Sequence, residues 1–339
     1  MPENVTIKEV AEEAGVSIAT VSYVLNKKKA ISQDTTQRVM EAISKLGYVP
    51  NLSARSLSSN DSLLIGVLVP QTEPGSTMMF QNGFYGEILG AIECEARING
   101  YHLIVSGTDP EESYLDLARK RNLDGIIAIG VYPSDFYLEA SSHDIPLVLV
   151  DSYCSGQHHH CVRIDDVYGS YLATKYLTDM GHQDIAFFCG KLRNDGVMQK
   201  RLEGYRQALE KRKIPFRKEL VFEGLIDFES GINLANKLID QKMPATAVLT
   251  AADILAIGAI KAFSARKINV PDDISIMGFD DLEVSKYIPP GLTTVKQQIS
   301  LKGKRAVEIL VQSIREPNLT KREEILAVDI VERGSVRKF

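Results

Sequence analysis

Several side chains near the start of the chain have the types and spacing needed to read a DNA duplex. A short helix over residues 18–26 would bury Val21, Val24 and Leu25, because apolar residues three and four apart share one helix face. Its other face could meet base edges and thymine methyl groups through Ile18, Ala19, Ser22 and Tyr23. Groups able to bond phosphates would come from Ser17, Thr20 and Asn26.

The residues before this helix predict the element that positions it. Thr6 and Glu9 have the spacing of a capping box, so a first helix should begin there. Gly15 falls where the chain must reverse, a position that often requires a positive φ. The two helices would form a helix-turn-helix with Thr6 close to the DNA. The same pattern also fits two packed helices that bind nothing.

A third helix should follow. Ser32 predicts its N-terminus and Gly47 its end, and its apolar stripe would be Val39, Ile43 and Leu46. With the next residues, Tyr48 to Leu57, the chain resembles the LacI/GalR (lactose/galactose repressor) family of transcription regulators. The resemblance covers essentially the whole chain. It implies three parts: an all-α headpiece over 1–49 that also contacts DNA through Tyr48, a hinge helix and linker over 50–61, and an effector-binding core over 62–339.

The segment between headpiece and core should act on DNA in its own right. In the family that the chain resembles, two such hinge helices, one per subunit, pack in the minor groove. The matching residues here are Asn51, Ala54, Arg55 and Leu57. A helix this short is marginal in water by itself, so we expect it to form only on DNA. The alternative is a flexible tether.

Beyond this linker, short apolar runs alternate with helical stretches. The runs are Leu63–Val69, His102–Ser106, Gly125–Ile129, Pro146–Val150, Ile185–Phe188, Ala247–Thr250 and Ile274–Met277. Near-continuous apolar strands separated by helices indicate a parallel sheet covered on both faces. The runs are too many for one ordinary sheet, so we predict an α/β core of two doubly wound parallel-sheet subdomains that face each other across a cleft. Small ligands in such folds lie outside the carboxyl ends of the strands.

The resemblance implies the same architecture, a periplasmic-binding-protein-like core with crossovers near residues 161, 291 and 324. Its motifs are Asp124-Gly125-Ile126-Ile127, Ile145-Pro146-Leu147-Val148, Met180-Gly181-His182-Gln183-Asp184-Ile185, Arg201-Leu202-Glu203-Gly204-Tyr205, Val270-Pro271-Asp272-Asp273-Ile274-Ser275, Gly278-Phe279-Asp280-Asp281 and Leu292-Thr293-Thr294-Val295. Gly291 departs from the family pattern as an extra residue at a crossover.

Two charged residues are expected in the cleft. The resemblance places Arg201 at the family's effector-binding arginine and Asp280 at the acidic position that accepts hydrogen bonds from ligand hydroxyls. A guanidinium with several donors and a carboxylate with acceptors suit a polyol such as a sugar. Asp151, directly after an apolar run, is a third candidate. The alternatives are a surface ion pair with Glu203 for Arg201 and a turn or cap for Asp280.

Three aromatic residues are further candidates for the effector site. Phe84 and Tyr85 match the segment that places an aromatic ring against the effector in the family. Aromatic faces stack on sugars and on bases alike, and burial in the core would explain these two residues equally well. Phe228 lies near the Glu-Ser-Gly element where relatives carry an aromatic residue.

Charge is divided unevenly along the chain. Residues 1–60 carry seven Lys and Arg against six Asp and Glu, and the remaining residues carry 32 against 38. The acidic body disfavours loose polyanion binding, so DNA affinity should come from local groups such as Lys27, Lys28 and Lys29, although this run also fits a solvated loop. Because the headpiece is only mildly basic, we expect a homodimer. The absence of a leucine-heptad tail favours a dimer over a tetramer.

Targeting and redox signals are few. The longest apolar run, Leu63–Val69, is strand length, and no apolar stretch follows a basic start. We therefore expect a cytoplasmic protein with no membrane partner, and four cysteines without CxxC spacing fit reduced thiols in that compartment. The segment Cys154–Cys161 holds five potential metal ligands, but three consecutive histidines cannot share one ion. We expect an exposed loop there and no metal.

Catalytic motifs are missing from the sequence: we find no phosphate loop, no nucleophile elbow and no His-Glu-x-x-His. We therefore expect neither an enzyme nor a cofactor. The sequence predicts a sequence-specific DNA-binding regulator, a repressor that binds operator DNA and is controlled by a sugar-like small molecule. The alternatives are a nucleoside or a phosphoprotein as the regulating partner, a solute-binding protein, and an enzyme fused to a DNA-binding head.

Overall fold

The computed structural model describes residues 5–26, 31–48, 62–70, 82–108, 120–130, 145–153, 159–194 and 196–339. The chain divides into two compact units, Met1–Ser62 and Leu63–Phe339. The predicted hinge residues Asn51, Ala54, Arg55 and Leu57 lie outside the described residues, as do Lys27, Lys28 and Lys29.

The described residues of the smaller unit form the three predicted helices, α1 (Ile7–Ala14), α2 (Ile18–Asn26) and α3 (Gln33–Leu46). Thr6 and Glu9 form the predicted capping box at the start of α1. Gly15 and Gly47 end α1 and α3 with φ of 64° each, the left-handed conformation that glycine adopts without steric cost. The Ser17 hydroxyl accepts a hydrogen bond from the Thr20 backbone N–H at 3.1 Å and so caps the N-terminus of α2.

Apolar side chains from all three helices form the core of this unit. Its buried members are Val10, Ala11, Ala14, Val21, Val39 and Ala42. Ile43 and Leu46 of the predicted stripe pack against this core but stay partly exposed, as do Val24 and Leu25. Within α1 and α3 the buried residues are one, three or four positions apart, so the local sequence was sufficient to predict these helices.

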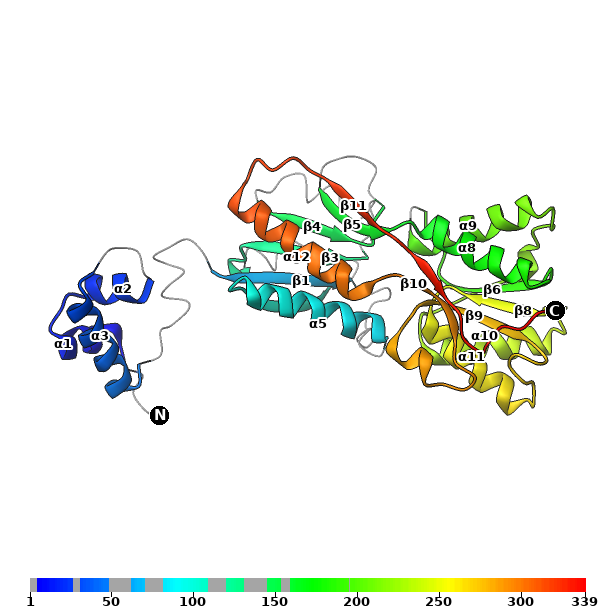
Figure 1. The fold of residues 1–339 in the computed structure, drawn as a ribbon, viewed down its shortest axis with the longest axis horizontal. Coiled ribbons are helices and arrows are strands. Elements are labelled where there is room, and N and C mark those ends of the chain that lie inside the picture. The colour runs from blue at the N-terminus through cyan, green and yellow to red at the C-terminus, as the bar shows by residue number, and fades with distance from the viewer. Residues whose placement is uncertain are drawn as a thin grey trace. The chain divides into compact units, whose positions relative to one another are not determined.

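In the larger unit, the described residues form two six-stranded sheets (Figure 1). The first sheet has the order β11-β5-β4-β3-β1-β2, with bounds Glu323–Leu326, His160–Ile164, Leu147–Val150, Gly125–Ile129, Leu64–Pro70 and His102–Thr108. The second has the order β12-β10-β9-β8-β6-β7, with bounds Asp329–Val331, Thr293–Lys296, Ser275–Asp280, Ala247–Thr250, Ile185–Gly190 and Val221–Gly224. All neighbouring strands are parallel except β10 and β12.

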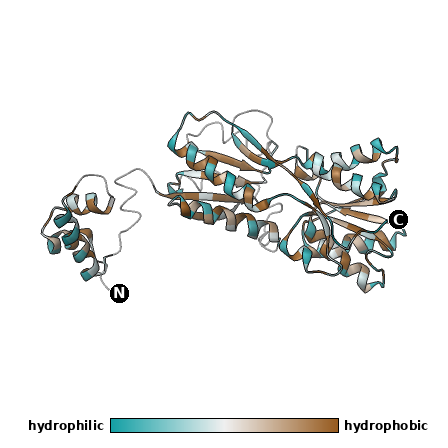
Figure 2. Ribbon diagram, in the orientation of Figure 1, coloured by the Kyte–Doolittle hydropathy of each residue, from teal (hydrophilic) through white to brown (hydrophobic). Residues whose placement is uncertain are grey.

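Helices cover these sheets and explain the apolar strands. Side chains of α5 (Gly83–Ile98) and α12 (Ile299–Arg315) pack on one face of the first sheet. On the second sheet, α8 (Asp166–Asp179) and α9 (Val197–Lys211) cover one face, and α10 (Phe228–Asp240) and α11 (Asp253–Ala265) cover the other. Figure 2 shows that the strands are hydrophobic and that the helices covering them are hydrophilic on their outward side. This arrangement confirms the predicted α/β architecture.

The chain passes between the two sheets three times. It leaves the first sheet after β5, returns to it through α12 after β10, and crosses again between β11 and β12. The positions expected from the sequence, residues 161, 291 and 324, precede these passages. Gly291, with φ of 84°, lies in the loop directly before β10, the strand after which the chain returns to the first sheet.

One expectation about local structure was wrong. His160 and Cys161 belong to the buried strand β5 and not to an exposed loop, because that strand pairs with β4 and β11 in the sheet interior. The apolar runs also did not predict five strands that are short and lie at or next to sheet edges: β5, β7, β10, β11 and β12. Among the described residues, no helix is long and apolar enough to cross a membrane.

Candidate DNA-binding and effector-binding sites

The outward face of α2 carries the residues expected to read bases. The side chains of Ile18 and Tyr23 are 48% and 37% exposed, Ala19 is exposed and Ser22 is half-buried. Exposed apolar groups on a short helix are available for the thymine methyl groups of the major groove. The Ser17 and Thr20 hydroxyls lie 2.9 Å apart at the helix N-terminus, where the free backbone N–H groups favour a phosphate.

Two other predicted DNA contacts already have roles within the headpiece. The Thr6 hydroxyl donates to the Glu9 carboxylate at 2.8 Å, and hydrogen bonds from Thr6 lower the pKa of Glu9. Tyr48 is half-buried and packs against the headpiece core. Asn26 ends α2, but its side chain lies outside the described residues.

Arg201 on α9 lies beside the carboxyl ends of β8 and β9, and it is buried. Its Nε donates to Asp166 Oδ1 at 2.8 Å, and one terminal nitrogen donates to the carbonyl of Ala251. The guanidinium lies 3.7 Å above the centre of the Phe279 ring, a cation–π contact that stabilises a desolvated charge. The alternative of a surface ion pair with Glu203 is therefore wrong, because Arg201 is 5% exposed.

Asp280 ends β9 and faces Arg201, with 3.7 Å between its Oδ1 and the nearest guanidinium nitrogen. Burial raises the pKa of Asp280 to about 8, and the attraction of Arg201 opposes this change. The φ of Asp280 is 126°. A non-glycine residue in that region is strained, and such strain is concentrated at functional sites.

Asp151 follows β4 and joins the same cluster through two residues that the sequence did not indicate. Lys302 on α12 donates to Asp151 Oδ1 at 2.7 Å and to Oδ2 at 2.8 Å. It also donates to Gln297 Oε1 at 2.6 Å. The Gln297 amide in turn donates to Asp280 at 2.5 Å. The three predicted charged residues, Asp151, Arg201 and Asp280, therefore belong to one network.

Tyr153 closes this network on its other side. Its hydroxyl donates to Asp166 Oδ2 at 2.7 Å, and Asp166 is the carboxylate that binds Arg201. Burial raises the pKa of Tyr153, so the phenol stays protonated. A series of polar contacts thus runs from Asp151 at the end of β4, through the crossover after β5 and the crossover after β10, and back to the same loop at Tyr153.

A neighbouring carboxylate supports the end of β9. Asp253 accepts hydrogen bonds from the Leu282 backbone at 2.9 Å and from the Ser285 and Thr294 hydroxyls at 2.6 Å each. It is completely buried, and burial raises its pKa to about 6. Asp253 therefore holds the turn after Asp280 in place, and its oxygens are already occupied by these donors.

The aromatic candidates are divided. Phe84 lies near the network, with its ring centre 5.5 Å from Lys302 Nζ. Tyr85 meets the Phe84 ring edge-on at 5.2 Å, and both pack against the core of the first subdomain. Phe228 is 40% exposed at the start of α10, and none of the hydrogen bonds and ion pairs that form the network involves it.

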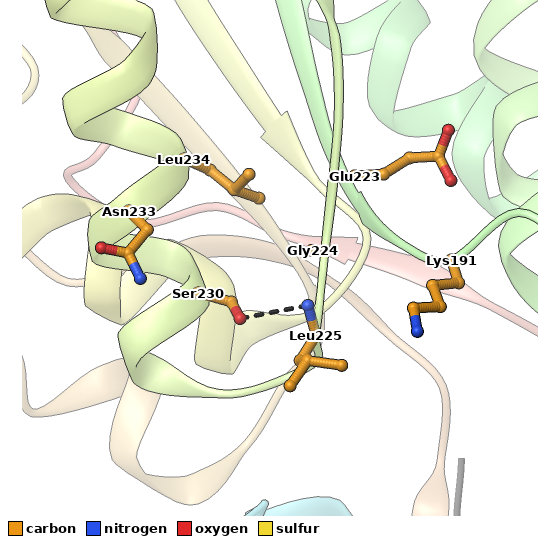
Figure 3. Close-up of a pocket in the computed structure, with 7 residues that line it drawn as sticks. All are labelled: Lys191, Glu223, Gly224, Leu225, Ser230, Asn233 and Leu234. Atoms are coloured by element: carbon orange, nitrogen blue, oxygen red, sulfur yellow. Dashed lines mark hydrogen bonds between the residues drawn. The ribbon is translucent and has the colours of Figure 1, made fainter. Parts of the chain in front are cut away.

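A surface pocket lies beside the start of α10 (Figure 3). Its lining residues are Lys191, Glu223, Gly224, Leu225, Ser230, Asn233 and Leu234, and Ser230 accepts a hydrogen bond from the Leu225 backbone. None of the charged network residues lines this pocket. The described residues contain no group of His, Cys, Asp and Glu suited to a metal, and Cys154 and His158 lie outside them.

Sequence patterns gave little warning of Asp166, Gln297 and Lys302. Asp166 resembles an ordinary acidic residue in a first helical turn. Lys302 is followed closely by Lys304 and Arg305, and such a run of basic residues normally indicates a helix face exposed to solvent. One available signal is position at a crossover, because Gln297 lies between β10 and α12, and Asp166 begins α8 shortly after β5.

A headpiece with an exposed recognition helix and a two-sheet core with a polar cluster at the strand ends define a DNA-binding regulator with a ligand-binding core. Two family models match the chain, one over the headpiece and one over part of the core. The model for bacterial regulatory proteins of the lacI family matches residues 6–51. The model for a periplasmic binding protein-like domain matches residues 174–336.

Whole-chain comparisons extend both matches. The chain is 33% identical over 340 residues to the HTH-type transcriptional repressor PurR of Histophilus somni, covering 98% of this chain and 99% of that protein. It therefore belongs to the LacI family of transcriptional regulators. The fold is similar to that of the lac repressor dimer bound to operator and the anti-inducer ONPF, with a TM-score of 0.83, 28% identity, and coverage of 99% and 100%. The transcriptional regulator CelR in complex with cellobiose matches with a TM-score of 0.71, 26% identity, and coverage of 98% and 99%. These relatives are regulators and not enzymes.

Proposed function

We propose that this protein is a homodimeric repressor that binds an operator through α2 and responds to a neutral, hydroxyl-rich molecule, a sugar or sugar derivative, in the core cleft. The observation that carries the effector class is the cluster of Arg201, Asp280 and Asp166 at the strand ends between the two sheets. Guanidinium donors beside carboxylate acceptors match the hydroxyl groups of a sugar, each of which both donates and accepts. The similar regulator CelR was solved with cellobiose.

The charges of the cluster favour an uncharged ligand. Lys302 and Arg201, its two cations, already have carboxylate partners at 2.7 and 2.8 Å. A phosphorylated sugar would have to compete with these carboxylates, whereas a neutral sugar exchanges only hydrogen bonds. A nucleoside is the second ligand class to test, because the Phe84 ring near the network could stack on a base as well as on a sugar.

A thermal-shift screen of sugars, sugar phosphates and nucleosides against the full-length protein tests the proposal. A ligand present at a hundredfold over its Kd should stabilise the core by about 2.7 kcal/mol. We expect neutral sugars to shift the unfolding midpoint and their phosphates to have no effect. Stabilisation by the phosphates alone would contradict the proposed effector class.

The repressor role needs a separate test. Selection of binding sites from random DNA should return a palindromic sequence, since two copies of the headpiece in a symmetric dimer read two half-sites. Sedimentation of the free protein at the same concentration should show the dimer. A monomer that binds random DNA equally well would contradict this part of the proposal.

A further inference from the structure

Lys302 is an unusual residue for the inside of a domain. Its side chain has no exposed surface, and an unpaired buried ammonium is strongly unfavourable. Each of its three N–H groups has one acceptor: Asp151 Oδ1 at 2.7 Å, Asp151 Oδ2 at 2.8 Å and Gln297 Oε1 at 2.6 Å. The Phe84 ring lies 5.5 Å from the nitrogen and adds a cation–π contact. The donors of the ammonium are therefore completely satisfied.

The oxygens around this ammonium come from different parts of the core. Asp151 ends β4 of the first sheet, and Lys302 lies on α12, which packs on that sheet. Gln297 follows β10 of the second sheet, and its amide donates to Asp280 at the end of β9. The ammonium thus connects a carboxylate of one subdomain to the polar end of the other through a single glutamine.

We propose that Lys302 is a tethered ligand of the cleft, a positioning residue whose ammonium fills a three-oxygen cation site and joins the two subdomains as a bound molecule would. Through Gln297 it fixes the orientation of Asp280. It also occupies both oxygens of Asp151. Asp151 is therefore a partner of Lys302 and not an acceptor for the effector, which leaves Asp280 and Arg201 to face it.

Chemical rescue separates this role from simple space filling. Lys302→Ala removes three carbons and the ammonium, and n-propylammonium replaces those atoms. In the full-length protein we expect Lys302→Ala to lower the unfolding midpoint and to speed amide hydrogen exchange in residues 280–286 about tenfold, the change for roughly 1.4 kcal/mol of lost local stability. n-Propylammonium should reverse both effects. n-Propanol, of similar size but uncharged, should reverse neither.

Two further variants keep the test decisive. Lys302→Ala combined with Asp151→Asn should not respond to n-propylammonium, because the cation site has lost its charge. Lys302→Met fills the space without a charge, and it should fold and show the same faster exchange in residues 280–286. Two results would show that the lysine only fills space. One is amide exchange in Lys302→Met as slow as in the unaltered protein, and the other is rescue of Lys302→Ala by n-propanol equal to that by n-propylammonium. Neither measurement needs an effector or DNA, so the outcome is independent of the proposed function.

Discussion

The two units of this protein place their recognition groups differently. On the headpiece, Ile18 is 48% exposed and the residues expected to read bases are uncharged. In the core, Arg201 and Asp280 are 5% and 4% exposed, and each depends on neighbours for its charge balance. A surface residue can be replaced with little cost to stability, whereas one member of a buried charge pair cannot. Substitutions should therefore separate the two units, with large stability effects in the core and specificity effects on the headpiece.

The largest effect should come from Arg201→Ala. The substitution leaves the Asp166 carboxylate buried without its cation, and breaking such a pair costs about 3–5 kcal/mol. We expect the urea midpoint of the core, followed by circular dichroism, to fall accordingly and the response to effector to be lost. The matched surface control is Arg266→Ala, whose partner Asp240 is 62% exposed and whose loss should change stability little. Equal losses in the two variants would contradict the buried role of Arg201.

The second effect is a dependence on pH that Asp280 imposes on the core. Its folded pKa of about 8 lies above the ordinary value of 3.8, so between these values the folded state holds a proton that the unfolded state has lost. The free energy of unfolding should therefore fall as the pH rises through this window. Asp253, with a pKa of about 6, adds to the fall below pH 6.

Asp280→Asn tests this dependence, because the amide cannot take up the proton. Denaturation at a series of pH values should show a flatter profile between about pH 6 and pH 8. Asp240→Asn, at an exposed carboxylate, should keep the slope of the unaltered protein. Parallel profiles for all three proteins would mean that Asp280 titrates at its ordinary pKa.

A smaller effect should appear in the headpiece with Thr6→Ala. The substitution removes the capping box of α1, and loss of such a cap costs about 1 kcal/mol. Calorimetry of the full-length protein should show a lower temperature for headpiece unfolding with the core transition unchanged. Movement of both transitions together would mean that the two units do not unfold independently.

The smallest stability effect should come from Tyr23→Arg, because the side chain is 37% exposed. Its effect should appear in DNA recognition, where an arginine can form a bidentate contact with guanine worth about 1–3 kcal/mol. Site selection with this variant should give a different preferred half-site. Identical selected sequences for both proteins would remove Tyr23 from the base-reading surface.

The same contrast explains what could be predicted from the sequence. The headpiece is specified by local spacing, since Thr6 and Glu9 are three residues apart and Ser17 and Thr20 are too. In the core, the apolar runs predicted the two sheets, and the resemblance to the LacI/GalR family predicted that Arg201 lies in the effector site. The contacts of the cluster connect residues 35 and 151 positions apart, from Arg201 to Asp166 and from Lys302 to Asp151. Such pairs have no local pattern, and they become visible only when the strands are in place.

The central claim is that a molecule bound among the buried charges controls what the exposed helix does on DNA. Fluorescence anisotropy with the selected operator measures this directly, in the presence and absence of the sugar that gives the largest thermal shift. We predict that the sugar changes operator affinity about tenfold or more, a coupling of roughly 1.4 kcal/mol. Arg201→Lys, which keeps the charge but loses the planar fork, should bind the operator without this response. A sugar that binds the unaltered protein and leaves its operator affinity unchanged would contradict the account.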